Sequence, residues 1–272
     1  MKDVQFQRWW ITTQVQLVKG GFFDGIVLTY DGVIEDETTQ IGIQSISKIP
    51  ILISNIAESL QTTVPGSQVM YVAPWSPKCT RSQCHDYEKI ASYCNTLIVL
   101  AFNMPAQKSG NCRAKAGAPY HQTITGIEAY IKLGIDSRKI VMGVPWFGID
   151  YPCERFIEAG NCELRVPNGG ARCSNRDATY VPYNLIMQAL PKSASGRIWD
   201  DDVKAPYYIY KSVKTYHEVW YDDPESISMR STFMKRYKLR GISVWYGNYL
   251  NYTSNVLAVM QTEEMWNALC PP

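Results

Sequence analysis

The stretch Phe23-Asp24-Gly25-Ile26-Val27-Leu28-Thr29-Tyr30-Asp31 decides the fold of this chain. Its short apolar run predicts a β-strand over Phe23–Tyr30. Because side chains alternate along a strand, Val27, Thr29 and Asp31 share one face. A carboxylate therefore stands at the carboxyl end of the strand, where parallel-strand barrels carry their catalytic groups. Asp31-Gly32 is also typical of a simple turn that leaves a strand.

The rest of the chain alternates similar apolar runs with longer helical segments, which predicts repeated βα units, a parallel sheet and an α/β fold. The further strands are expected at Gln68–Ala73, Thr96–Asn103, Lys139–Trp146 and Gly241–Tyr246. Helices are expected at about Thr38–Thr62, Thr123–Leu133, Tyr183–Ala189, Ser226–Tyr237 and Ser254–Leu269. Pro50 is expected to end or kink the first of these near Lys48.

Composition excludes several classes of protein. With 272 residues, 46% of them hydrophobic and 19% charged, the chain can bury a large core. The longest apolar run, Leu97–Phe102, is far shorter than the roughly 20 residues that cross a bilayer, so no membrane insertion is expected. Lys+Arg 27 against Asp+Glu 25 leaves a net charge of +2 without a basic cluster, so nucleic acid is not an expected partner. Without a linker or repeat, residues 1–272 are interpreted as one domain.

The eight cysteines favour disulfides and an oxidising compartment. A zinc site using Cys79, Cys84, His85 and Cys94 is the alternative, although no Cys-x2-Cys pair supports it. Three cysteines fall in the stretch Tyr151–Tyr180, which is interpreted as an irregular, cysteine-rich insertion at about 151–180 that a disulfide would hold. Asn251-Tyr252-Thr253 is a glycosylation acceptor for a secretory lumen. Residues 1–8 are mixed and polar and do not form the expected signal peptide, so an incomplete or alternatively started chain is expected, with cysteines that are reduced in a cytosolic setting as the alternative.

Asp24-Gly25-Ile26 followed by Asp31 resembles the Asp-Gly-x-x-x-Asp-x-Glu strand of glycoside hydrolase family 18, the chitinase family. Eight further segments look like their counterparts in this family, in the same order. They are Ala73–Lys78, Ala118–Tyr120, Thr125–Gly126, Val141–Trp146, Ala205–Tyr208, Val219–Asp222, Leu239–Ile242 and Gln261–Trp266. The resemblance implies a (β/α)8 TIM-barrel fold. Phe23–Tyr30 would stand in place of the fourth strand of the family, so the barrel is expected to be incomplete, with its first three strand-helix units missing.

The resemblance also implies a chemistry. Members of the family cleave bonds next to N-acetylglucosamine with retention of configuration, using the acetamido oxygen of the substrate as the nucleophile. A Glu protonates the leaving oxygen, and an Asp two residues earlier orients the acetamido group. In this sequence Asp31 replaces the Glu and Thr29 replaces the Asp. No metal or cofactor is implied.

Other positions that match the sugar-binding residues of the family are also changed. Phe102 and Asn103 stand where the family commonly has Tyr and Asp, and Phe147 stands where it commonly has Tyr. Trp245 matches the Trp beneath the sugar ring, whose flat face suits the C–H face of a pyranose. By the same match Trp146, Tyr221 and Asp222 line the groove, with ordinary packing as the alternative for each of them.

Three hypotheses follow. The chain is a glycosidase that acts on N-acetylglucosamine oligosaccharides, such as chitin fragments or the chitobiose core of Asn-linked glycans, with Asp31 as proton donor. Alternatively, it is an inactive protein that binds these sugars, or a truncated barrel without carbohydrate function. By resemblance the expected location is lysosomal or secreted.

Overall fold

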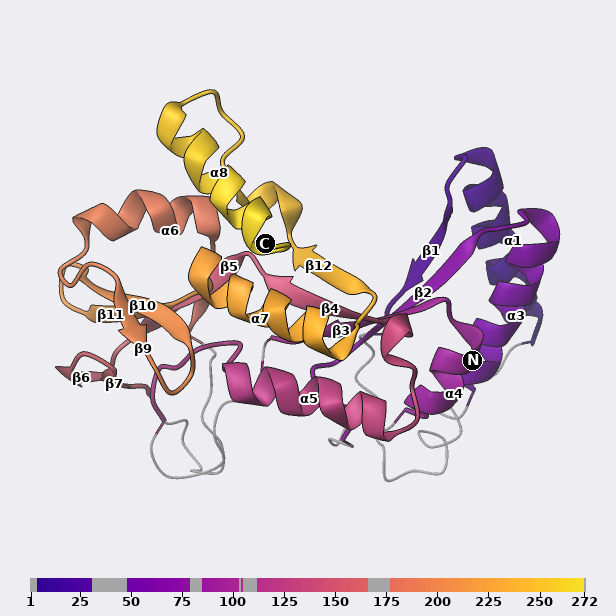
Figure 1. The fold of residues 1–272 in the computed structure, drawn as a ribbon, viewed down its shortest axis with the longest axis horizontal. Coiled ribbons are helices and arrows are strands. Elements are labelled where there is room, and N and C mark those ends of the chain that lie inside the picture. The colour runs from indigo at the N-terminus through magenta and orange to yellow at the C-terminus, as the bar shows by residue number, and fades with distance from the viewer. Residues whose placement is uncertain are drawn as a thin grey trace. The chain divides into compact units, whose positions relative to one another are not determined.

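A computed structural model of the protein describes residues 4–30, 48–78, 85–102, 104, 112–165 and 177–271 (Figure 1). The chain forms two compact units. The first contains residues 1–100, 125–142 and 238–241, and the second contains residues 101–124, 143–237 and 242–272. The single-domain interpretation stays a prediction.

The first unit is built on a parallel α/β arrangement. Its elements are α1 (Val4–Gly20), β1 (Gly25–Leu28), α3 (Ile49–Thr63), β2 (Gln68–Ala73), α4 (Tyr87–Tyr93), β3 (Thr96–Leu100) and η1 (Ser137–Lys139). Helix α5 (Tyr120–Lys132) and strands β4 (Ile140–Pro145) and β12 (Gly241–Trp245) have residues in both units. The strand order of the sheet is β1-β2-β3-β4-β12. All five strands that the sequence predicts are therefore present and belong to this sheet.

Register in this sheet is well defined. β1 pairs in parallel with β2 from Gly25 opposite Gln68, and β2 pairs in parallel with β3 from Met70 opposite Thr96. β3 is an almost continuous apolar run in which Leu97 and Val99 are fully buried, as expected for a parallel strand covered on both faces. In α5, a Cβ added at Gly126 would lie 2.0 Å from the carbonyl oxygen of Trp75, so glycine allows this close approach.

Helix α3 begins at Ile49, and Pro50 occupies its first turn. A proline is tolerated there because the first amide groups of a helix have no partner within the helix. Pro50 thus lies in the first turn of a helix whose N-cap is Lys48, which agrees with the predicted interruption of the helical segment near Lys48. The predicted helical residues 38–47 lie outside the described residues. Ile53, Ile56 and Leu60 form the buried stripe of α3, which packs against α1.

The second unit adds an antiparallel sheet that the sequence did not predict. Its strand order is β8-β5-β11-β10-β9. The strands are β5 (Phe147–Pro152), β8 (Thr179–Pro182), β9 (Ile198–Asp200), β10 (Ala205–Lys211) and β11 (Tyr216–Trp220). The other elements are α6 (Tyr183–Ala189), η2 (Leu190–Lys192), α7 (Pro224–Tyr237), η3 (Gly247–Tyr249) and α8 (Val256–Ala268). The predicted helices at Tyr183–Ala189, Ser226–Tyr237 and Ser254–Leu269 correspond to α6, α7 and α8.

The predicted irregularity of Tyr151–Tyr180 is wrong for part of this stretch. β6 (Arg155–Glu158) and β7 (Asn161–Glu163) form an antiparallel hairpin, in which Gly160 takes a positive φ of +76° at the turn. The disulfide Cys153–Cys162 joins the two ends of this hairpin, with a Cα–Cα distance of 5.2 Å. The expectation of a disulfide in this stretch is therefore confirmed.

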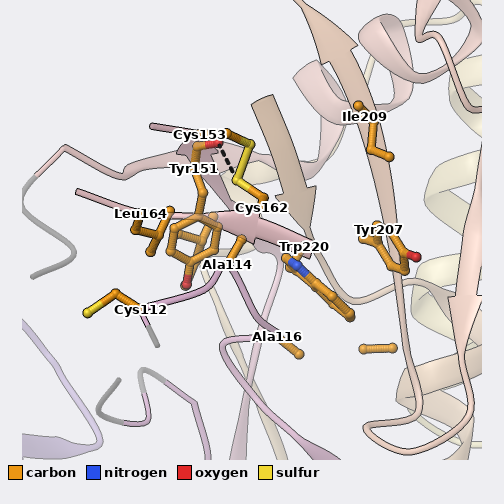
Figure 2. Close-up of a cluster of buried hydrophobic side chains, with 12 residues drawn as sticks. Cys112, Ala114, Ala116, Tyr151, Cys153, Cys162, Leu164, Tyr207, Ile209 and Trp220 are labelled. Carbon is orange, nitrogen blue, oxygen red and sulfur yellow. Dashed lines mark hydrogen bonds between the residues drawn. A yellow bond between two sulfur atoms is a disulfide. The ribbon is translucent and has the colours of Figure 1, made fainter. Parts of the chain in front are cut away.

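One face of the antiparallel sheet packs on this hairpin. Figure 2 shows the disulfide beside Tyr151 and Leu164, with Trp220 and Tyr207 in the same buried cluster. The Tyr207 and Trp220 rings stack with centroids 4.4 Å apart. The Sγ atom of Cys162 lies 3.9 Å from the carbonyl oxygen of Tyr151. This is a van der Waals contact and not a hydrogen bond, because a disulfide sulfur carries no proton. The opposite face packs with α6, α7 and α8 through a second buried cluster.

Among the described residues, no helix has the length and the apolar character needed to cross a membrane.

Candidate functional site

The strand that carries the expected chemistry ends at Leu28, and Thr29 follows it with an exposed side chain. This agrees with a position at the carboxyl end of a parallel strand. Asp31, the expected proton donor, and Asn103, an expected sugar contact, lie outside the described residues. The catalytic roles of Thr29 and Asp31 therefore stay predictions.

Three of the expected sugar-binding residues form one aromatic cluster in the second unit. The centroids of Phe102 and Phe147 are 5.6 Å apart with the rings perpendicular, and those of Phe102 and Trp245 are 6.3 Å apart. Tyr180 lies with its edge against Phe147 at 5.0 Å, and Tyr246 lies 4.9 Å from Trp245. The Trp245–Tyr246 peptide bond is cis. Phe102 and Phe147 are buried while Trp245 is half-buried, so the cluster combines two buried phenylalanine rings with a partly accessible indole.

Backbone hydrogen bonds explain why these residues meet. The Ala101 amide donates to the Gly143 carbonyl at 3.0 Å, and the Trp146 amide donates to the Trp245 carbonyl at 2.9 Å. Both bonds extend the pairing of neighbouring chain segments beyond the ends of β3 and β4. Side chains at or just after the carboxyl ends of parallel strands converge at one edge of a sheet, which agrees with the grouping of Phe102, Phe147 and Trp245 that the family resemblance implied.

Trp146 and Tyr221 are buried in the packing of the second unit. Trp146 is 0% exposed and packs edge-on against Trp266 with centroids 4.8 Å apart. Tyr221 is 3% exposed and belongs to the same buried cluster. The structure places both side chains where the packing alternative expects them, and their role in binding sugar stays a prediction.

Asp222 is held in a buried polar network. The Asp222 carboxylate lies 3.0 Å from the Arg230 guanidinium and accepts a 2.8 Å hydrogen bond from the Ser226 hydroxyl. Arg230 also donates to the carbonyl oxygens of Ser226 and Ala118. Burial raises the pKa of Asp222, while Arg230 and Ser226 act in the opposite direction. The network fixes the chain directly after β11.

Sequence reasoning missed Glu218, a buried carboxylate on the disulfide-linked face of the antiparallel sheet. Glu218 is 0% exposed and accepts hydrogen bonds from the Trp220 indole at 2.7 Å and from the Gly160 amide at 3.0 Å. Burial raises the pKa of Glu218 from 4.5 to about 7. The sequence did contain a signal for this residue, because Glu218 is a charged residue among aromatic and β-branched neighbours in Tyr216–Trp220.

We expect Glu218 to make the stability of the fold depend on pH. The folded state keeps the Glu218 proton up to about pH 7, whereas the unfolded chain releases it near 4.5. The free energy of unfolding should therefore fall as the pH rises between these values, by on the order of 3 kcal/mol. Urea unfolding at pH 5, 6, 7 and 8 measures this change. The Glu218→Gln variant should lose this part of the slope, and equal slopes in both proteins would contradict the assignment.

His217 is joined to Asp150 on the other face of the antiparallel sheet. His217 Nδ1 lies 2.8 Å from Asp150 Oδ1, and the Tyr210 hydroxyl donates to Asp150 Oδ2 at 2.6 Å. The His217 and Tyr210 rings stack with centroids 4.6 Å apart. Asp150 also lines a cavity of about 710 Å³ between α6, η2 and the sheet.

Among the described residues, no group of three or more His, Cys, Asp or Glu side chains could hold a metal ion. Of the cysteines in the alternative zinc site, Cys94 is a buried free thiol, and Cys79 and Cys84 lie outside the described residues. Burial raises the pKa of the Cys94 thiol to about 12, which disfavours the thiolate that zinc binds.

The parallel sheet, with the expected site residues at or just after its strand ends, defines an α/β protein of the kind found in TIM-barrel enzymes. The sequence pattern described as "Glycosyl hydrolases family 18" matches residues 1–248, and the chain belongs to this family. The chain is 40% identical over 271 residues to di-N-acetylchitobiase of Homo sapiens, a match that covers 99% of this chain and 69% of that protein. It is also 40% identical to di-N-acetylchitobiase of Mus musculus, with 99% and 73% covered.

Solved structures agree on the fold. The class V chitinase from Nicotiana tobaccum has a TM-score of 0.75 at 16% identity, over 97% of this chain and 74% of that one. The GH18 chitinase from Cycas revoluta in complex with (GlcNAc)3 has a TM-score of 0.74 at 16% identity, over 98% and 74%. At this identity the likeness concerns the fold alone. The predicted family and fold class are confirmed.

Proposed function

We propose that this protein is a chitobiase-like glycoside hydrolase that acts on N-acetylglucosamine-containing oligosaccharides, with the chitobiose core of Asn-linked glycans and chitin fragments as substrates. Membership of family 18 and the 40% identity to di-N-acetylchitobiases support the substrate class. The observation that carries the proposal is the aromatic cluster of Phe102, Phe147 and Trp245. It supplies a half-buried indole on which the apolar face of a sugar ring can stack.

In the proposed mechanism, the acetamido oxygen of the substrate attacks the anomeric carbon, and the bond to the leaving sugar oxygen breaks. Asp31 gives its proton to that oxygen, and then accepts a proton from the water that opens the cyclic intermediate. The configuration is retained because the anomeric carbon is inverted twice. Thr29 carries no charge, so this site stabilises the cationic intermediate less than an aspartate would.

A second candidate function is sugar binding without catalysis. It is favoured by the five changed positions, Thr29, Asp31, Phe102, Asn103 and Phe147, which together remove two carboxylates, shorten another and remove two phenol hydroxyls. The stacking indole of Trp245 is kept. A truncated barrel without carbohydrate function is the third hypothesis, and a cooperative thermal transition of the purified chain would argue against it.

We also propose a lysosomal or secreted location. The Cys153–Cys162 disulfide supports an oxidising compartment.

The Asp31→Asn variant tests the catalytic proposal. Asparagine has nearly the same shape and cannot donate the proton, so we expect the release of N-acetylglucosamine from di-N-acetylchitobiose to fall at least about 100-fold. The assay is run from acidic to neutral pH with the full chain, and circular dichroism confirms that the variant is folded. Calorimetry with chitooligosaccharides is run in parallel. Sugar binding without turnover in either protein would favour the second candidate, and equal turnover in both would remove Asp31 from the mechanism.

A further inference from the structure

A cavity lies on the face of the antiparallel sheet opposite to Phe147. Along β5, Phe147 and Ile149 point to one face, and Gly148 and Asp150 point to the other. The cavity of about 710 Å³ is lined on the sheet side by Asp150, Tyr208 and Tyr210. On the helical side it is lined mainly by residues of α6 and η2, among them Leu185, Gln188 and Lys192. It is therefore separate from the aromatic cluster around Trp245, and its volume is within the range of about 300–1,000 Å³ of small-molecule sites.

The carboxylate in this cavity is fixed in place. Tyr210 and His217 each bind one oxygen of Asp150, and the side chain of Asp150 is 14% exposed. Because a carboxylate only accepts hydrogen bonds, His217 Nδ1 donates to it. Each carboxylate oxygen can accept two hydrogen bonds, so these two contacts leave acceptor positions for a ligand. A ligand that meets Asp150 must therefore carry donors, such as hydroxyl groups.

The opposite wall supplies complementary groups. Lys192 is exposed and can donate to a ligand oxygen, and Gln188 can both donate and accept. Lys211 also borders the cavity, but its ammonium lies over the Tyr216 ring at 5.1 Å. Tyr216 projects from the other face of the sheet, so among the residues that the structure describes, Asp150 and Lys192 supply the carboxylate and the ammonium that face the ligand. Their charges cancel, and a neutral ligand fits better than an anion or a cation.

The remaining walls are aromatic and aliphatic. The Tyr208 and Tyr210 rings lie 6.2 Å apart with 34° between their planes, and Leu185 and Val181 complete the apolar lining. Tyr208 is 2% exposed, and the Tyr210 ring stacks on His217. A carboxylate acceptor, a cationic and an amide donor, and this aromatic and aliphatic lining together match one class of ligand. A sugar ring carries hydroxyls that donate and accept around its edge, and it has an apolar C–H face.

We propose that this cavity binds a neutral saccharide unit, independently of the site at Trp245. Asp150 accepts hydrogen bonds from ligand hydroxyls, Lys192 and Gln188 bind from the opposite wall, and the tyrosine rings contact the apolar face. His217 and Tyr210 are positioning residues for Asp150. Such a site would let the protein hold one sugar of a branched glycan away from the reacting bond.

The test uses the full chain with Trp245→Ala, which removes the indole of the first site. Binding of D-glucose, D-mannose and N-acetyl-D-glucosamine is followed by ligand-observed NMR. We expect saturable binding of at least one of these sugars, with a Kd on the order of 1 mM. Asp150→Asn should weaken this binding about tenfold. Leu185→Trp, at a side chain that is 48% exposed, should block the cavity and abolish the binding without unfolding the protein.

Asp201→Asn is the matched control, because Asp201 is an exposed carboxylate beyond β9 that does not line the cavity. It should leave sugar binding unchanged. The proposal is overturned if none of the three sugars binds, or if binding is equal in the Asp150→Asn, Leu185→Trp and control proteins. In a chain that keeps Trp245, the Asp150→Asn variant should turn over di-N-acetylchitobiose at the rate of wild type. Loss of sugar binding in the cavity is therefore distinguishable from failure of the proposed hydrolase function.

Discussion

Replacing Thr29 by aspartate and Asp31 by glutamate in one chain is expected to raise the turnover of di-N-acetylchitobiose by about 10³-fold. Glutamate extends the proton donor by one methylene, or about 1 Å, and misplacement on this scale can reduce a rate about 100-fold. Aspartate in place of Thr29 adds the negative charge that stabilises the cationic intermediate. In other enzymes, removing one group that stabilises transition-state charge lowers kcat by about 10²–10³-fold. The two groups act on the same intermediate, so their effects should not multiply fully.

The single variants divide this gain. Asp31→Glu alone should raise kcat by improving proton transfer, and Thr29→Asp alone should raise it less because the short donor still limits the rate. Thr29 is exposed after the end of β1, so an aspartate there does not bury a charge. The control is Thr29→Asn with Asp31→Gln, which matches the size of the restored pair but can neither donate the proton nor supply the charge. Equal rates in the control and the restored protein, with sugar binding retained, would contradict the mechanism.

The aromatic cluster offers a second stage of the same experiment. Phe102 and Phe147 are buried with perpendicular rings 5.6 Å apart, and the family commonly has a tyrosine at each position. Tyrosine at both positions in the restored protein should increase kcat/KM further, because each added hydroxyl can bind the acetamido group. A fall in kcat/KM would mean that these hydroxyls have no partner and are buried at a cost of about 1–3 kcal/mol each.

The parallel sheet could be predicted from the sequence because its strands are short apolar runs that are separated by helical segments. Val4–Gly20 was missed as a helix because a mixed, polar sequence hides a narrow buried stripe of Ile11, Val15 and Val18. The antiparallel strands β10 and β11 were missed because their aromatic residues alternate between two covered faces, so no simple polar and apolar alternation marks them. Tertiary packing decides their structure, and only the fold reveals it.

For the candidate site, the grouping of residues could be predicted from the sequence, but the burial of individual side chains could not. Phe102, Phe147 and Trp245 could be grouped because each matches a sugar-binding position of the family, and all three lie at or just after the carboxyl end of a strand of the parallel sheet. The environment of a side chain could not be predicted: Trp146 precedes Phe147 in sequence but is completely buried against Trp266. The raised pKa of Glu218 likewise depends on burial beneath a hairpin that is distant in sequence.

The second large effect is expected at Arg230, which is 1% exposed and joins two of the segments that resemble the family. Its guanidinium pairs with Asp222 at 3.0 Å and donates to the Ala118 carbonyl, which is 112 residues away along the chain. Arg230→Met keeps a long apolar side chain but leaves a buried carboxylate and a carbonyl without their donor. We expect it to lower the free energy of unfolding by about 3–5 kcal/mol, measured by urea denaturation.

The double variant Arg230→Met with Asp222→Asn shows where this loss comes from. Asparagine removes the buried charge and can still accept from the Ser226 hydroxyl, so the double variant should be more stable than Arg230→Met alone, by about 1–3 kcal/mol. Because Asp222 in Arg230→Met loses its cationic partner, its pKa should rise further, and the single variant should regain stability as the pH falls. Arg230→Lys keeps the charge without the planar fork and should lose less than Arg230→Met. If the double variant is instead as unstable as the sum of the two single variants, the two side chains are not coupled, and the destabilisation comes only from the lost contacts of Arg230 with the backbone.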